Sequence, residues 1–200
     1  RSVVITGASD GIGAALACAL AEPGRRLLLV ARRADRLDAV AQRCREAGAA
    51  TEIAALDVTH RQAMADALMR YDAARPVDIV IANAGVSAGL SPGQAPEEPT
   101  AAQRVFDVHI HGMLNTLDPL VPGMLVRGEG QIALMSSLAA MAPLADMPSY
   151  SASKAAIRAY GTSLRRWLTP RGIAVSVICP GFVTSAMSAR HEGFKPFEIP

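Results

Sequence analysis

The sequence lacks the features that would mark a nucleic-acid-binding or a membrane protein. Its 20 Lys and Arg against 18 Asp and Glu leave a net charge of +2, and the basic residues form no block. We therefore expect no nucleic-acid partner. No apolar run approaches the roughly 18 residues that a membrane-spanning helix needs, so we expect no membrane span. There is also no repeat and no linker, which predicts one domain over residues 1–200.

Cysteine is scarce as well. The three cysteines, Cys18, Cys44 and Cys179, are far apart and have no metal-ligand spacing. Dispersed cysteines in an odd number favour reduced, mostly buried thiols and a cytoplasmic location. We expect no secretory leader, with a leader that has been removed as the alternative. The pair His109 and His111 could chelate zinc from a strand, but it lies in a predicted helix, where residues two apart point roughly 200° from each other. We expect no metal site.

What the sequence does contain is an alternation of apolar runs and helix-like segments, in a chain of which half the residues are hydrophobic. The predicted strands are 2–6, 26–31, 50–55, 78–82, 131–136 and 173–179, and the predicted helices are 11–22, 34–47, 60–73, 100–127 and 149–168. This alternation predicts an α/β fold, a doubly wound, Rossmann-like parallel sheet with helices on both faces. Pro119 and Pro122 predict a kink or a break in the helix at 100–127, and clustered Gly and Pro predict a loop at 85–99.

The first strand leads into three glycines, in the stretch SVVITGASDGIG at 2–13. Gly7 permits a tight turn, Gly11 allows backbone to approach a pyrophosphate, and Gly13 lets the helix pack close to the strand, with its N-terminal amides facing the anion. The turn therefore predicts a dinucleotide site. A glycine-rich turn without any ligand is the alternative.

The same stretch resembles the TGxxxGxG cofactor motif of the short-chain dehydrogenases/reductases. Further stretches resemble family motifs in the family's order: LDV at 56–58, ANAG at 82–85, YSASK at 150–154 and PGFVT at 180–184. The resemblance implies a cofactor site formed by Gly7, Ser9, Asp10, Gly11, Ile12, Gly13, Arg32, Arg33, Asp57, Val58, Asn83, Ala84, Gly85, Tyr150, Lys154, Pro180, Gly181, Val183 and Thr184. Family members continue with another strand and helix, so the resemblance predicts that these are missing, and that the substrate loop starts near residue 185.

The resemblance also implies an activity, the interconversion of a carbonyl and an alcohol by hydride transfer to or from a nicotinamide cofactor. Tyr150 is the expected general acid/base, with its pKa lowered by the ammonium of Lys154 four residues on and by the positive nicotinamide ring of an oxidised cofactor. Ser137 would hydrogen-bond the substrate oxygen, and Lys154 would also bind the nicotinamide ribose. His109 occupies the place of the family's fourth catalytic residue, an Asn, and we expect a neutral imidazole that holds a relay water. The alternative is a nucleotide-binding sensor or scaffold on the same fold.

The cofactor prediction is NADP, with NAD less favoured. Arg32 follows the second predicted strand, where an acidic residue would favour NAD, and its guanidinium suits a 2′-phosphate. Arg33 adds a second cation. A solvated, charged helix entry is the alternative, and Asp10 stands where some NADP-preferring members carry a cation.

The substrate is expected to be a small carbonyl or alcohol. Apolar side chains near the site predict an apolar pocket, although they are equally compatible with ordinary core: Leu138, Met141, Pro143 and Met187. Small residues on the helix after Tyr150 predict a homodimer or homotetramer formed through this helix and the one at 100–127.

Overall fold

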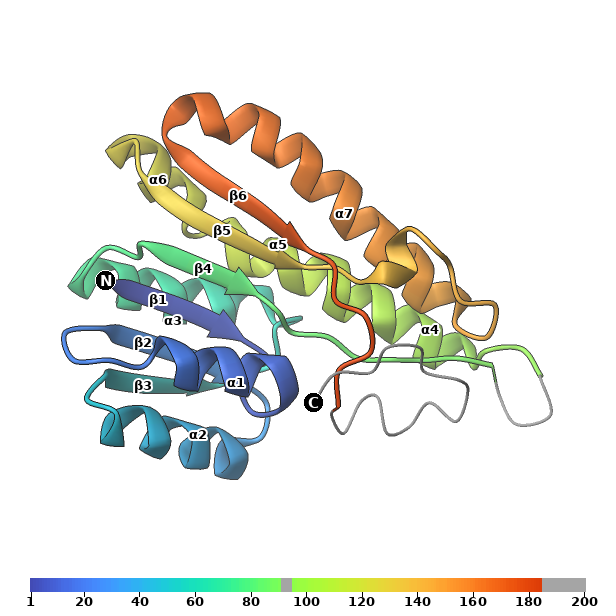
Figure 1. Cartoon of the computed structure of the whole chain (residues 1–200), viewed down its shortest axis with the longest axis horizontal. Coiled ribbons are helices and arrows are strands. Elements are labelled where there is room, and N and C mark those ends of the chain that lie inside the picture. The colour runs from blue at the N-terminus through green and yellow to red at the C-terminus, as the bar shows by residue number, and fades with distance from the viewer. Residues whose placement is uncertain (91–94, 185–200) are drawn as a thin grey trace.

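The six predicted strands form one parallel sheet in the computed structural model, which describes residues 1–90 and 95–184 (Figure 1). They are β1 (Ser2–Thr6), β2 (Arg26–Ala31), β3 (Ala50–Ala55), β4 (Ile79–Ala82), β5 (Gly130–Met135) and β6 (Ile173–Ile178). Their order in the sheet is β3-β2-β1-β4-β5-β6, so the winding reverses between β1 and β4. In such sheets, ligands bind beyond the carboxyl ends of the strands at this switch point.

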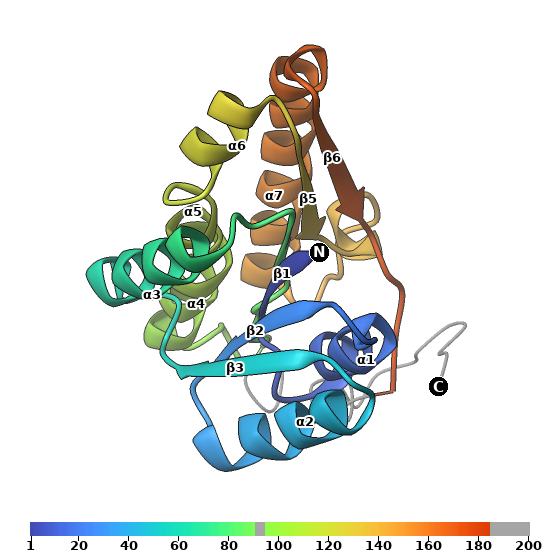
Figure 2. The same cartoon turned by 90° about the vertical axis from the view of Figure 1, so that its left-hand side faces the viewer.

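Helices connect the strands. They are α1 (Gly11–Leu20), α2 (Ala34–Glu46), α3 (Arg61–Ala74), α4 (Pro99–Phe106), α5 (Gly112–Leu117), α6 (Val121–Arg127) and α7 (Pro148–Leu168). Figure 2 shows α1 and α2 on one side of the sheet and α3, α4 and α5 on the other. The predicted doubly wound sheet with helices on both faces is confirmed.

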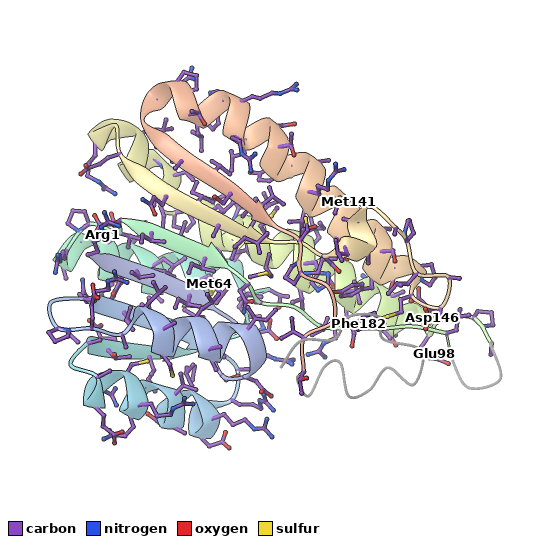
Figure 3. The ribbon with its side chains drawn as sticks, in the orientation of Figure 1. Arg1, Met64, Glu98, Met141, Asp146 and Phe182 are labelled. Atoms are coloured by element: carbon purple, nitrogen blue, oxygen red, sulfur yellow. The ribbon has the colours of Figure 1, made fainter. Side chains whose placement is uncertain are left out.

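The sheet separates two apolar clusters because successive strand residues point to opposite faces. On the α1 and α2 face, Ile5 and Leu29 pack with Leu37 of α2. On the other face, Val4 packs with residues of α3, α5 and α7, such as Met64, labelled in Figure 3. Each face of β1 is thus fully buried, which explains why its sequence is a continuous apolar run.

The helix predicted at 100–127 is divided into segments. Between α4 and α5, residues Asp107–His111 form one π-helical turn, closed by a hydrogen bond from the Gly112 amide to the Asp107 carbonyl oxygen. The turn inserts an extra residue and reorients the side chains that it carries. The predicted break is confirmed at Pro119, because α5 ends at Leu117 and α6 begins at Val121.

The remaining expectations concern membrane spans, cysteines, metal ligands and the substrate loop. No helix within 1–90 and 95–184 is long and apolar enough to cross a membrane. Cys18, Cys44 and Cys179 are all free thiols, although only Cys44 is fully buried. Among the described residues, no group of three or more His, Cys, Asp or Glu could hold a metal ion. The predicted substrate loop from 185, and Met187 in it, lie outside the described residues.

Candidate active site

The predicted site residues gather at the carboxyl ends of the strands. This edge is on the right in Figure 1, where the arrowheads of β1, β4 and β6 point. Met141 and Phe182 lie at the same end in Figure 3, past β5 and β6. An open hollow of about 460 Å³ lies elsewhere, between the start of α3 and α5, and none of the predicted site residues lines it.

The glycine turn after β1 brings α1 and the segment after β4 close to the backbone at Gly7. Gly7 has φ +67°, a left-handed conformation, and a Cβ there would lie 2.8 Å from the Ala84 Cα. A Cβ on Gly13 would overlap the carbonyl oxygen of Gly7, so only glycine lets α1 start this close to the strand. Asp10 caps α1 by accepting a hydrogen bond from the Gly11 amide at 2.8 Å.

Two amides of the first turn of α1 are left for a ligand. The Ala14 amide bonds to the Asp10 carbonyl oxygen, but the amides of Ile12 and Gly13 have no acceptor among the described residues. Ser9 lies beside them in the same turn and is half-buried. Free amides at a helix N-terminus suit a pyrophosphate.

The ends of β1 and β4 are tied together beneath this turn. The Thr6 hydroxyl oxygen accepts hydrogen bonds from the amides of Asn83 and Ala84, each at 3.1 Å. The Asn83 side chain donates to the Thr6 carbonyl oxygen at 2.9 Å. Asn83, predicted as a cofactor residue, therefore also links the carboxyl ends of β1 and β4 at the switch point.

A group of exposed charges follows β2. The Asp10 carboxylate accepts hydrogen bonds from Arg36 at 3.1 Å and from Arg33 at 3.4 Å. Arg32 points instead toward Asp57, with 3.7 Å between its guanidinium and the carboxylate. Asp10 thus binds two of the three arginines and leaves Arg32 as the most loosely paired cation of the group.

Asp57 and Val58 form the opposite wall of this region. The Asp57 carboxylate is held by hydrogen bonds from the amide and hydroxyl of Thr59, at 3.0 and 2.9 Å. Val58 is buried, and its carbonyl oxygen accepts from the Asn115 side chain at 2.9 Å. The LDV stretch is therefore held in place by a hydrogen bond from α5.

Tyr150 lies in the first turn of α7, where burial raises the pKa of its phenol and a hydrogen bond with the Ser137 side chain acts in the opposite direction. Lys154 is not among the groups that shift this pKa, whereas the lowered pKa expected beside an oxidised nicotinamide ring stays a prediction. Tyr150 is half-buried, and the ammonium of Lys154 lies 5.6 Å from its ring centroid but donates to the Met135 carbonyl oxygen. The raised pKa keeps the phenol protonated at neutral pH, as in an ordinary tyrosine.

Lys154 is buried at 4% exposure, one turn along α7. Its ammonium donates to the Met135 carbonyl oxygen at 2.9 Å, and the Lys154 carbonyl oxygen accepts from the hydroxyl of Ser136. Burial lowers the pKa of Lys154 to about 8. At pH 7 the group is still mostly charged, a buried cation at the end of β5.

His109 is on the π-helical turn, and its imidazole is 1% exposed. Burial, and then the charge of Lys154, hold its pKa well below 6.5, which agrees with the expected neutral form. One ring nitrogen accepts from the Val86 amide at 3.1 Å, and the other lies 2.7 Å from the hydroxyl oxygen of Ser153. Both nitrogens therefore have protein partners, and the expected relay water has no ring nitrogen to bind.

The strand end after β6 completes the site. The Pro180 carbonyl oxygen accepts from the Leu138 amide at 2.9 Å, which joins the PGFVT stretch to the residues after Ser137. Gly181 faces the Leu138 side chain, and Val183 and Thr184 follow it. Leu138 and Met141 are about half exposed, at 49% and 52%, so they form an apolar surface and not core. Pro143 is exposed beside them.

Several site residues escaped the sequence reasoning. Glu97 caps α7 by accepting from the amide and hydroxyl of Ser149, at 3.1 and 2.9 Å. Ser153 joins His109 to α7, and Arg36 joins the arginine group. The position of Ser153 one turn after Tyr150 was the only sequence signal for its role, whereas nothing in the sequence pointed from Glu97 to Ser149, 52 positions away.

Comparison with known proteins gives a family match. The family described as short chain dehydrogenase matches residues 1–194. An uncharacterized oxidoreductase of Myxococcus xanthus (strain DK1622) is 36% identical over 198 residues, which are 98% of this chain and 78% of that protein.

Solved structures share the fold. L-sorbose reductase from Gluconobacter frateurii, complexed with NADPH and L-sorbose, superposes with a TM-score of 0.83 at 31% identity, over 93% of this chain and 71% of its own. A short chain dehydrogenase from Mycobacterium paratuberculosis bound to NAD superposes with a TM-score of 0.85 at 27% identity, over 94% and 74% of the two chains. Similar proteins thus bind either cofactor.

Proposed function

This chain belongs to the short-chain dehydrogenase family and is an oxidoreductase, and from that premise we propose that it interconverts a carbonyl and an alcohol with NADP(H), with Tyr150 as the general acid. The observation that carries the proposal is the position of the Tyr150 phenol, which is hydrogen-bonded with Ser137 and whose ring centroid lies 5.6 Å from the ammonium of the buried Lys154. A protonated phenol can donate its proton to a carbonyl oxygen, as the reductive direction requires.

The residues act on the substrate oxygen. A carbonyl oxygen placed against Ser137 and Tyr150 accepts hydrogen bonds from both hydroxyls, and the phenol proton passes to it as negative charge develops. The Lys154 ammonium stabilises the phenolate that remains. In the reverse direction the same phenolate takes the proton of an alcohol.

The chain fits a dinucleotide cofactor, which supplies or accepts the hydride when bound. The fit rests on the turn that only glycine can form and on the two amides of Ile12 and Gly13. These amides would hold the pyrophosphate. Asp57 and Val58 would hold the adenine and Pro180 to Thr184 the nicotinamide end, and Asn83, Ala84 and Gly85 would line the cofactor site between them.

We assign the cofactor preference to Arg32. Within 1–90 and 95–184 its guanidinium pairs with Asp57 alone, 3.7 Å away, so it can turn to a 2′-phosphate at small cost. Arg33 and Arg36 lie close behind it on Asp10 and add positive potential. NAD stays the second candidate.

The proposed substrate is apolar. Leu138 and Met141 expose hydrophobic surface at the same strand ends as Tyr150, and an apolar carbonyl compound would cover it. A sugar would leave that surface in poor contact.

We also propose that the protein is a homodimer or homotetramer. Ala152, Ala155, Ala156 and Ala159 are all exposed on α7, so the small-residue face is available for close packing with a second copy. Light scattering at micromolar concentration tests this, and a monomer would overturn it.

Oxidation of NADPH in the presence of a panel of ketones, aldehydes and quinones tests the function. We expect turnover with an apolar member, a higher kcat/KM with NADPH than with NADH, and a kcat about 1,000-fold lower for Tyr150→Phe. Binding of NADPH without turnover of any carbonyl or alcohol would instead favour a nucleotide-binding sensor.

A further inference from the structure

His109 makes a chain of contacts that ends at the backbone of Tyr150. The Val86 amide donates to His109 Nε2 at 3.1 Å, and His109 Nδ1 lies 2.7 Å from Ser153 Oγ. Ser153 Oγ then donates to the Tyr150 carbonyl oxygen at 2.7 Å. The chain therefore joins the segment after β4 to the π-helical turn and to the first turn of α7.

The partners fix the position of the ring proton. The Val86 amide can only donate, so Nε2 must be the bare nitrogen of a neutral ring. The single proton then lies on Nδ1 and points to Ser153 Oγ. Because Ser153 Oγ accepts a hydrogen bond from the imidazole, its own hydroxyl proton is free to go to the Tyr150 carbonyl oxygen. The three hydrogen bonds therefore run in one direction, from the Val86 amide to the Tyr150 carbonyl oxygen.

The surroundings leave little room for another arrangement. A Cβ on Gly85 would lie 3.1 Å from His109 Nε2 and 3.7 Å from the Lys154 ammonium, so the glycine makes space for both. The imidazole also packs edge-on against the Tyr150 ring, with 5.6 Å between the centroids. The ring thus contacts Tyr150 directly and, through Ser153, holds its backbone.

We propose that His109 is a positioning residue, which as the neutral Nδ1–H tautomer acts through Ser153 to hold Tyr150 in its reactive orientation. This inference rests on the proposed function of Tyr150 as the acid. It replaces the expected role of His109 as the holder of a relay water, because the two ring nitrogens are occupied by Val86 and Ser153.

Protonation would break this chain. A proton on Nε2 would face the Val86 amide, donor against donor, beside the cation of Lys154. The titratable groups that face the imidazole are Tyr150 and Lys154 from α7, and Cys179 at the end of β6 acts on Lys154. Activity should therefore show a loss on acidification, well below pH 6.5, that a variant without this imidazole lacks.

The first test is the tautomer. We would record ¹⁵N chemical shifts of the histidine rings in the whole protein at pH 7.5 and assign His109 by the signals missing from His109→Asn. We expect a protonated Nδ1 and a bare Nε2. A proton on Nε2, or rapid exchange between tautomers, would overturn the proposal. This measurement needs no substrate, so it stands even if no carbonyl is turned over and the proposed function fails.

The second test separates the two ring nitrogens. Asn places its amide nitrogen at the position of Nδ1, so His109→Asn keeps the donor to Ser153, whereas His109→Leu keeps neither contact. With the accepted substrate we expect kcat to fall about 10- to 100-fold in His109→Leu and in Ser153→Ala, and about threefold or less in His109→Asn. The double variant His109→Leu/Ser153→Ala should be no slower than His109→Leu.

Matched controls keep a general loss of structure apart from the proposed role. His111→Leu removes an exposed histidine two residues away, and Ser163→Ala removes an exposed hydroxyl on α7. Both should keep kcat, and the Kd of NADPH should stay within about twofold in all variants. Wild-type kcat in Ser153→Ala, or His109→Asn as slow as His109→Leu, would overturn the proposal.

Discussion

Different kinds of interaction fix the two ends of the candidate cofactor site, the end that follows β2 and the end beside α7. At the β2 end, the interactions are ion pairs between exposed side chains: Arg32 and Arg36 are each 50% exposed and Asp10 is 39% exposed. At the α7 end, Lys154 and His109 are at most 4% exposed and are fixed by hydrogen bonds to backbone and hydroxyl groups.

Exposed ion pairs and buried hydrogen bonds differ in strength, and so in what each end of the site can do. Exposed ion pairs are worth about 0–1 kcal/mol each and are screened by salt, so a bound phosphate can rearrange them easily. Buried polar groups cost several times more to leave unpaired, and so they hold one geometry. We infer that the first end selects the cofactor and the second end holds the reacting atoms in place.

The largest expected effect is at the buried end. Tyr150→Phe removes the proton donor that is hydrogen-bonded with Ser137 and should lower kcat about 1,000-fold. Steady-state rates with NADPH check this, with Tyr160→Phe, a half-exposed tyrosine on the same helix, as the control. Retained turnover in Tyr150→Phe would mean that another group supplies the proton.

The next effect is on stability. Burial lowers the pKa of Lys154 from 10.5 to about 8, a cost of about 3 kcal/mol for the charged form. Below pH 8 both the folded and the unfolded chain carry this charge, so the cost applies in full. Between pH 8 and 10.5 the folded chain loses the proton first, and its stability should rise.

Lys154→Met tests this cost. At pH 7 we expect the variant to be inactive but more stable by about 2 kcal/mol, since the hydrogen bond to Met135 is lost as well, with a rise of about 4–8 °C in Tm. Thermal unfolding of wild type, Lys154→Met and the exposed control Arg158→Met at pH 7 and pH 10.5 checks it. A gain that stays equal at both pH values would exclude the buried charge as its cause.

At the exposed end the effects are smaller and depend on the cofactor. Arg32→Asp removes a cation and adds an acceptor for a ribose hydroxyl, so NADPH should bind about 10- to 100-fold more weakly and the order of NADPH and NADH should reverse. Titration by nicotinamide fluorescence measures both. Arg32→Gln, which only removes the charge, should weaken NADPH without improving NADH, and an unchanged ratio in Arg32→Asp would refute the assignment.

The smallest effect is at Asp10, which competes with a phosphate for Arg33 and Arg36. Asp10→Asn keeps a helix cap but removes the competing charge, so NADPH should bind about two- to fivefold more tightly at low salt, with NADH unchanged. Asp35→Asn, an acidic residue in the first turn of α2, is the control. Equal tightening of both cofactors would point to a general charge effect.

Much of this site was predictable because it depends on local patterns. The glycine turn and the pair Tyr150 and Lys154 each lie within a few residues of one another, so spacing alone brings them together. The strand and helix ranges followed from apolar periodicity. The π-helical turn at Asp107–His111 was not predicted, because no composition signal marks one inserted residue within a helix.

Order and spacing along the chain were enough to predict the family, the doubly wound parallel sheet and the residues that follow its strands. The strand order, with its reversal between β1 and β4, came from the structure. The tertiary structure decided the hydrogen-bond partners and the raised pKa of Tyr150, which partial burial causes. His109 is bound on both sides because Val86 and Ser153, 67 positions apart, meet at its ring. Burial and long-range contacts depend on how the elements pack, which no local pattern records.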